Sequence, residues 1–282
     1  MLAPVLLLLA FFVCGLAGGI VQSFGILRAA GLYGFTLHYY KAVFFEPNLL
    51  LSIRTSLRVT GISSAAAVVT GVLLSAVFSR TGFTRSRAYH IFKLPVLIPH
   101  TVVAGLIINL FSQSGLLARL CFAIGILRDS RDFIPAVFDN GFVGVMLGYL
   151  WKEIPFIVLV VATVMTNISE SLGEAAINLG ASRMRSFFHV ILPLCLPSAA
   201  LSFVMVFTYS FGAYELPLLL GPTSPRALPV QAYVEYTNPD LAHRPYAMVL
   251  NTLTVVTGVI FTTLYFRLMK NSAQKTEVHP YD

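Results

Sequence analysis

The sequence predicts an all-α membrane protein with six transmembrane helices in a single domain, residues 1–282. Of its 282 residues, 57% are hydrophobic and only 11% are charged, and the mean hydropathy is +0.80. A soluble domain carries about 25% charged residues, so the soluble class is excluded. The apolar runs are long and continuous, whereas the strands of a membrane barrel alternate apolar and polar residues. Helices are therefore the structure that pairs every backbone group inside lipid.

Each span is placed on an apolar run of roughly 20 residues, the length that crosses a hydrocarbon core. The spans are expected near residues 4–24, 56–78, 94–111, 141–165, 197–220 and 246–266. The first run lacks a charged n-region and is too long for a signal-peptide h-region, so we interpret it as a membrane helix. Residues 25–52 carry aromatic side chains that suit a membrane–water interface. Residues 221–245 are rich in proline, which predicts an irregular outer loop.

Several other classes of protein find no support in the sequence. The chain has three cysteines without a C-x-x-C pair, so neither a disulfide framework nor a zinc site is expected. The net charge is +7, but the basic residues flank apolar runs, which favours the lipid bilayer over nucleic acid as partner. No Gly-Lys dipeptide occurs, so a Walker A phosphate loop is absent, and no H-E-x-x-H or G-x-S-x-G motif is present. We expect no metal or cofactor in this chain.

The connection between the fourth and fifth spans, residues 169–197, carries helix start and stop signals. Ser171 opens an S-x-x-E capping box, which predicts the start of a short helix. Gly180 stands where a left-handed residue would end that helix. Ser182 can cap a second helix, and Pro193 is expected to stop it. The sequence therefore predicts a helix–turn–helix between two membrane spans.

The spacing E-A-A-x3-G-x9-[I/V]-x-L-P in this connection resembles the EAA loop of permease subunits of binding-protein-dependent type I ABC importers. The residues that carry the motif are Glu174, Ala175, Ala176, Gly180, Val190, Leu192 and Pro193. In that family the loop is cytoplasmic and docks as a coupling helix into a cleft of the ATPase subunit. The resemblance implies that these residues couple the chain to an ATPase. The alternative interpretation is an amphipathic interfacial loop.

The same resemblance implies the partners and the location of the chain. It implies a non-catalytic subunit whose partner, a cytoplasmic ABC ATPase dimer, binds ATP and Mg. It also implies a second permease subunit (another chain or a copy of this one) and an extracytoplasmic solute-binding protein. The location would be the bacterial inner membrane, with both termini cytoplasmic. Basic residues are equally numerous on the two sides, so charge alone does not orient the chain. A secondary transporter and an intramembrane enzyme stay open as alternatives.

Ionisable residues inside membrane spans are costly and therefore candidates for function. Lys152 and Glu153 lie in the fourth expected span, and Tyr214 and Glu215 lie near the end of the fifth. We interpret these four residues as candidates for the translocation path. Neighbouring residues on a helix do not face each other, so Lys152 and Glu153 are not expected to pair. The alternative is a structural role, in which each carboxylate meets a basic partner or water in the bundle.

The end of the fifth span also carries a resemblance that bears on the substrate. Residues 211–221 read F-G-A-x-x-x-P-x-L-L-G, which resembles spermidine/putrescine-type permeases. Glu153 and Glu215 would attract a polyamine, whereas Lys152 would favour an anion. The resemblance therefore implies a polyamine as substrate. Similar segments in iron(III), thiamine and phosphonate permeases leave those solutes as alternatives.

Overall fold

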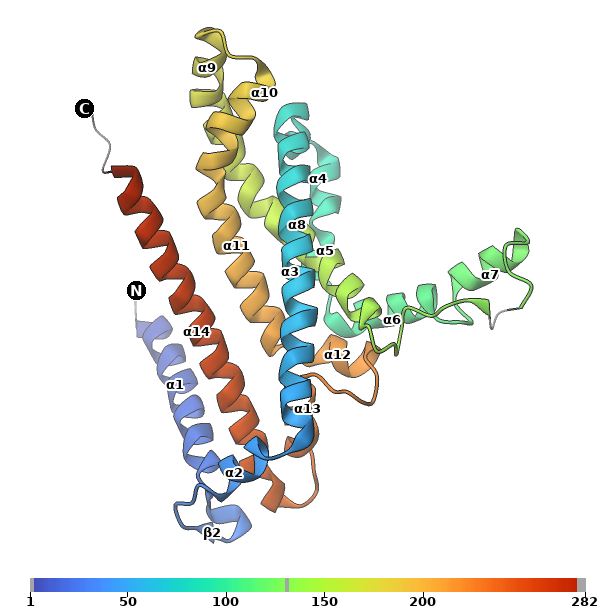
Figure 1. Ribbon diagram of the computed structural model, residues 1–282, viewed down its shortest axis with the longest axis vertical. Helices are drawn as coiled ribbons and strands as arrows, with labels where there is room; N and C mark the ends of the chain where they lie inside the picture. Colours follow the sequence, from blue (N-terminus) through green and yellow to red (C-terminus); the bar gives the residue numbers. More distant parts are fainter. Residues whose placement is uncertain (1–2, 130–131, 278–282) are drawn as a thin grey trace.

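Six helical segments are long and apolar enough to cross a membrane within residues 3–129 and 132–277, which the computed structural model describes. They are Ala3–Ser23, Pro47–Thr81, His100–Ala123, Val143–Ile168, Arg183–Gly212 and Leu241–Arg267. The predicted all-α fold with six membrane helices is thus confirmed. The helices form an elongated bundle with a helical hairpin at one end (Figure 1).

The centre of the bundle is the contact between α3 (Pro47–Thr81) and α8 (Val143–Ile168). Gly71 of α3 lies against Ile157, and a Cβ atom added to this glycine would be 2.6 Å from the Ile157 Cγ2 atom. A side chain at this position would therefore push the two helices apart. The next helix, α11 (Leu192–Gly212), packs on both of them and completes the core that holds the site described below.

The two terminal helices lie side by side at the edge of the bundle (Figure 1). α1 (Ala3–Ser23) leaves nearly all of its apolar side chains exposed, as expected of a helix that contacts lipid. It packs on α14 (Arg244–Glu277), which runs antiparallel to it. The segment after α1 forms three short elements: β1 (Ile26–Leu27), β2 (Leu32–Tyr33) and α2 (His38–Phe44). The two strands pair antiparallel, and α2 packs against α14.

The third expected span is not one continuous helix. Residues 94–111 form α5 (Leu94–Leu97) and α6 (His100–Phe111), which α4 (Arg87–Phe92) precedes and α7 (Leu116–Ala123) follows. Between α5 and α6, Ile98 is extended with ψ 131°. The reason is Pro99, whose ring disfavours the helical conformation of the residue before it. α6 and α7 consequently turn away from the bundle axis (Figure 1).

The fifth expected span is also broken. α11 ends at Gly212, Ala213 is extended with ψ 129°, and α12 (Glu215–Leu220) starts two residues later. The expectation of an irregular loop over residues 221–245 is wrong in its middle part, which forms α13 (Leu228–Tyr236). Pro229 sits in the first turn of α13, where a missing N–H costs nothing, so this proline starts a helix instead of preventing one.

Candidate translocation site and coupling hairpin

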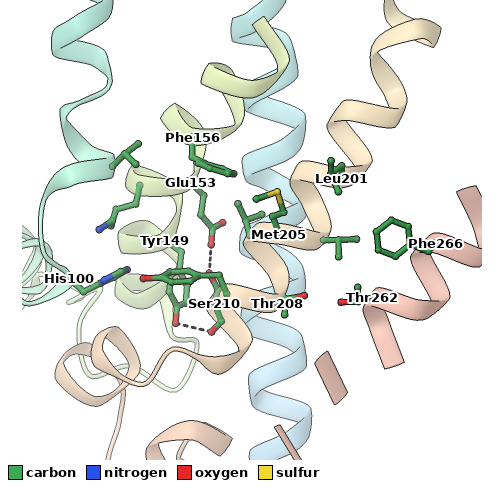
Figure 2. Close-up of a pocket in the computed structure, with 15 residues that line it drawn as sticks. His100, Tyr149, Glu153, Phe156, Leu201, Met205, Thr208, Ser210, Thr262 and Phe266 are labelled. Carbon is green, nitrogen blue, oxygen red and sulfur yellow. Dashed lines mark hydrogen bonds between the residues drawn. The ribbon is translucent and has the colours of Figure 1, made fainter. Parts of the chain in front are cut away.

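A cavity of about 710 Å³ lies among α5, α8, α11 and α14 and is open along part of its wall, where Met205 and Phe266 are exposed (Figure 2). Most of its lining is apolar, and polar groups enter it from α6, α8, α11 and α14. The polar side chains that line it include His100, Tyr149, Lys152, Glu153, Tyr209 and Ser210. A largely apolar cavity with a few converging polar groups is typical of a small-molecule site.

The Glu153 carboxyl group is deeply buried at this cavity, with 5% of the residue exposed. Its Oε1 atom accepts a hydrogen bond from the Ser210 hydroxyl of α11. One turn earlier on α8, the Tyr149 hydroxyl donates to the Ser210 carbonyl at 3.2 Å, so both bonds tie α8 to α11 (Figure 2). The Glu153 Oε2 atom is buried and has no hydrogen-bond partner among the described residues. An unsatisfied buried acceptor costs about 1–3 kcal/mol, so this oxygen offers a binding site for a donor.

The neighbouring Lys152 is engaged elsewhere. Its Nζ atom donates to the Ile98 carbonyl at 2.5 Å. That carbonyl lies outside both helices, because α5 ends at Leu97, Ile98 is extended, and the N–H of Val102 donates to the Pro99 carbonyl instead. Among the described residues, Lys152 and Glu153 form no ion pair with each other, as expected of adjacent helical positions. The lysine therefore does not pair directly with the Glu153 carboxylate.

Glu215 and Tyr214 are not part of the cavity lining. Glu215, the first residue of α12, has its Oε2 atom 3.2 Å from Nδ1 of His100, the first residue of α6. Tyr214 stacks on Tyr233 of α13, with 4.6 Å between the ring centroids. Of the four residues predicted for the path, the structure thus places Lys152 and Glu153 at the cavity and Glu215 at its margin.

Sequence reasoning missed several polar residues of the cavity. His100 is an ionisable residue inside an apolar run, so the rule that selected Lys152 would also have selected it. Tyr149 stands four residues before Glu153, the spacing that places two side chains on the same helix face. Ser210 gave no local signal, because its role depends on a contact with a residue 57 positions earlier in the chain.

At one end of the bundle, the predicted short helix does form, but it starts differently. A π-helical turn, η4 (Ser169–Gly173), continues α8 into α9 (Glu174–Asn178). Gly173 is helical, with φ −64° and ψ −44°, so the chain is already wound before α9. The capping box predicted at Ser171 is therefore wrong, because a cap residue must be non-helical. The Ser171 hydroxyl lies outside the described side chains.

The turn between the two short helices is as predicted. Gly180 has φ +91°, the left-handed conformation that ends a helix. Its N–H donates to the Ile177 carbonyl at 2.9 Å, and the Ala181 N–H donates to the Ala176 carbonyl at 3.0 Å. These two bonds satisfy the last carbonyls of α9. Ser182 then caps the second helix, and its Oγ atom accepts the backbone N–H three residues later at 3.3 Å.

The prediction that Pro193 stops the second helix is wrong. α10 (Arg183–Ser186) continues through a second π-helical turn, η5 (Phe187–Ile191), directly into α11. In that turn the Leu192 N–H bonds to the Phe187 carbonyl, one residue further back than in an α-helix. A π turn gives the backbone additional width, and the proline is thereby accommodated in the first turn of α11. Val190, Leu192 and Pro193 consequently lie at the base of the hairpin.

Residues 172–188, here called the coupling hairpin, expose several large apolar side chains on their surface. The Ser186 hydroxyl donates a hydrogen bond to the Gly173 carbonyl at 3.1 Å and so joins the two helical halves of the hairpin. Glu174 and Ala175 are exposed, and Ala176 is half-buried. The exposed large apolar side chains are Leu172, Ile177, Leu179, Met184 and Phe188. Leu179 at the tip is 89% exposed. Such a patch marks a surface that contacts another protein or a membrane.

The amino-acid sequence is similar to those of known permeases. It is 29% identical to a probable molybdenum ABC transporter permease protein of Haloferax volcanii, covering 73% of this chain and 72% of the relative. It is 26% identical to a molybdate/tungstate transport system permease protein of Pyrococcus furiosus, covering 79% and 80%. It is 24% identical to a putrescine transport system permease protein of Escherichia coli, covering 71% of each chain.

Comparisons with solved structures and with a family model lead to the same family as these relatives. A chain of a bacterial alginate ABC transporter, solved in complex with an alginate pentasaccharide-bound periplasmic protein, superposes with a TM-score of 0.77 at 19% identity. The alignment covers 94% of this chain and 91% of that one, which shows a common fold. The model of the family described as binding-protein-dependent transport system inner membrane component matches residues 67–277. The chain therefore belongs to this family and is a non-catalytic permease subunit of a type I ABC importer.

Proposed function

We propose that this permease carries a small cationic solute, with a polyamine such as putrescine or spermidine favoured. The observation that carries the proposal is the buried Glu153 carboxylate, whose Oε2 atom has no partner among the described residues. The Lys152 ammonium donates a hydrogen bond to the Ile98 carbonyl and forms no ion pair with Glu153 among the described residues. A buried carboxylate that is not directly paired with a cation attracts a positively charged group and repels an oxyanion. Iron(III) and thiamine are also cationic and would suit the negative charge of Glu153. The anions phosphonate, molybdate and sulfate would instead need the positive charge of Lys152.

The experiment that tests this proposal is uptake by the complete importer in lipid vesicles. The permease is reconstituted with its second permease subunit, its ATPase and its cognate binding protein. We expect ATP-dependent, saturable accumulation of labelled putrescine, and no accumulation of labelled molybdate or sulfate above that of vesicles without ATP. Uptake of an oxyanion without uptake of putrescine would contradict the proposal.

The coupling hairpin is the proposed docking site of the ATPase. Its exposed apolar side chains and the exposed Glu174 and Ala175 offer a surface for a protein partner. Helix α8 leads into the hairpin and α11 leads out of it, and these helices carry Glu153 and Ser210. Closure of two ATPase subunits on nucleotide would therefore move both walls of the cavity together, in a two-state transition biased by nucleotide. Family membership contradicts the alternatives of a secondary transporter and an intramembrane enzyme.

Orientation follows from this docking, because the ATPase is cytoplasmic. Both termini and the coupling hairpin are then cytoplasmic, while residues 221–245 face outside. In a background without native cysteines, Ser182→Cys is expected to react with an impermeant thiol reagent only from the cytoplasmic side. Ser224→Cys, at the other end of the bundle, is expected to react only from outside; both serines are exposed. Labelling of Ser182→Cys from outside would reverse the assignment.

A further inference from the structure

The coupling hairpin is joined to the membrane bundle through two π-helical turns. α8 enters the hairpin through η4, and the hairpin continues into α11 through η5. A π turn is rare and occurs mostly as a single turn at functional sites. It interrupts the regular hydrogen bonding of an α-helix and is one of the few features at which a helix bends. A movement of the hairpin therefore reaches the cavity helices through two positions that could bend.

The two π turns lie against each other and are linked by a buried hydrogen bond. Ser186, which is 2% exposed and directly precedes η5, donates its hydroxyl to the carbonyl of Gly173, the last residue of η4. Ile191 packs closely on the same glycine, because a Cβ atom added to Gly173 would be 3.2 Å from the Ile191 Cδ1 atom. The two turns therefore form one compact joint.

A third helix contacts this joint. Arg80, in the last turn of α3, places its guanidinium over the Phe187 ring, with 4.8 Å between Cζ and the ring centroid. Phe187 is the first residue of η5, and its carbonyl accepts the π-type hydrogen bond from Leu192. The end of α3 lies beside the hairpin (Figure 1), and α3 packs on α8 at the centre of the bundle. Arg80 thus connects the start of the π turn to the central helix.

We propose that the paired π turns are a braced joint, in which Arg80 and Ser186 are positioning residues. The brace keeps the turns from bending, so that a movement of the hairpin is passed to α8, α11 and α3 together. Without the brace, part of that movement would be absorbed in the turns before it reaches the cavity. A guanidinium is always charged in proteins, so the contact does not depend on protonation. The proposal rests on the proposed docking of the ATPase at the hairpin.

The test measures how strongly nucleotide at the ATPase changes the reactivity of a thiol at the cavity. The reporter is Met205→Cys, a lining position of α11, in a complete importer whose other cysteines are replaced. N-ethylmaleimide labels the importer in lipid vesicles with and without ATP and vanadate, and the change in labelling rate is the response. Arg80→Gln should lower the response roughly two- to fivefold, the factor that corresponds to a cation–π contact of about 0.5–1 kcal/mol. The readout uses no transported solute, so it does not depend on the substrate class.

Variants of Phe187 separate the brace from other roles of Arg80. A cation at the C-terminal end of a helix is stabilising by itself, and an exposed arginine can also bind a phosphate group. Phe187→Leu keeps an apolar side chain but removes the ring, so it should lower the response as Arg80→Gln does. The double variant should be no worse than either single variant, and Arg80→Lys, which keeps a cation, should recover most of the response. Additive losses, or a normal response in Phe187→Leu, would overturn the brace.

A second cation–π contact offers a matched control. The Lys93 Nζ atom lies 4.1 Å from the centroid of the Tyr89 ring, and both residues belong to α4 and its C-terminal end. Lys93→Gln should leave the response at the parent value, whereas Ser186→Ala should lower it. Pull-down of the ATPase should be normal in every variant, and weaker pull-down in Arg80→Gln would make Arg80 a docking residue instead of a brace.

The outcomes distinguish the brace from the docking on which it rests. A parent importer that does not respond to nucleotide would contradict docking of the ATPase at the hairpin, and the brace would fail with it. A parent that responds, together with full responses in Arg80→Gln and Ser186→Ala, would overturn the brace alone.

Discussion

Replacing Gly180 by valine is expected to abolish transport while leaving the membrane bundle folded. Gly180 has φ +91°, a conformation that costs a residue with a Cβ atom roughly 1–2 kcal/mol. A Cβ atom added here meets no atom of the chain within 4 Å, so within the subunit the only penalty is this local strain. Against a docked ATPase, the added side chain would occupy the contact surface itself. We expect uptake and substrate-stimulated ATP hydrolysis to fall by more than about tenfold, a loss of at least roughly 1.4 kcal/mol in coupling.

The matched control is Gly31→Val. Gly31 is exposed, has φ +70° and likewise has no atom within 4 Å of an added Cβ, but it lies in the β1–β2 turn at the other end of the bundle. The backbone strain is expected to be similar in the two variants, but Gly31 does not lie on the coupling hairpin. The measurements are uptake, ATP hydrolysis and pull-down of the ATPase. Normal ATPase association and uptake in Gly180→Val would show that the coupling hairpin is not the docking site.

Glu153→Gln is expected to weaken transport of a cationic substrate without disrupting the bundle. The amide oxygen of glutamine can still accept the Ser210 hydroxyl, so the link between α8 and α11 is retained. The other position becomes an NH₂ group, which repels an ammonium where Oε2 would bind it. A hydrogen bond to a charged group is worth about 1.5–3 kcal/mol, so the apparent affinity for putrescine should fall roughly 10- to 100-fold.

The concentration dependence of putrescine uptake in vesicles measures this effect. Glu235→Gln is the control, because it removes a carboxylate that pairs with His243 outside the cavity lining. It should leave the concentration dependence unchanged. An unaltered half-saturating concentration in Glu153→Gln, with the complex intact, would return Glu153 to a purely structural role.

Local signals predicted much of this protein. Apolar run length alone located the six membrane helices, because lipid leaves the backbone no other way to pair its groups. Gly180 and Ser182 were recognised because a left-handed helix end and a serine cap depend on neighbouring residues only. Lys152 and Glu153 stood out because charged residues are rare inside spans, and the structure places both at the cavity.

Tertiary structure decided what those signals could not. A proline is compatible with a helix when a π turn precedes it or when it stands in the first turn, so Pro193 continues a helix and Pro229 starts one. The Glu153–Ser210 bond joins residues on different helices. Periodicity and propensity describe neighbours along the chain, whereas this contact depends on how α8 and α11 pack, which the sequence specifies only through the whole fold.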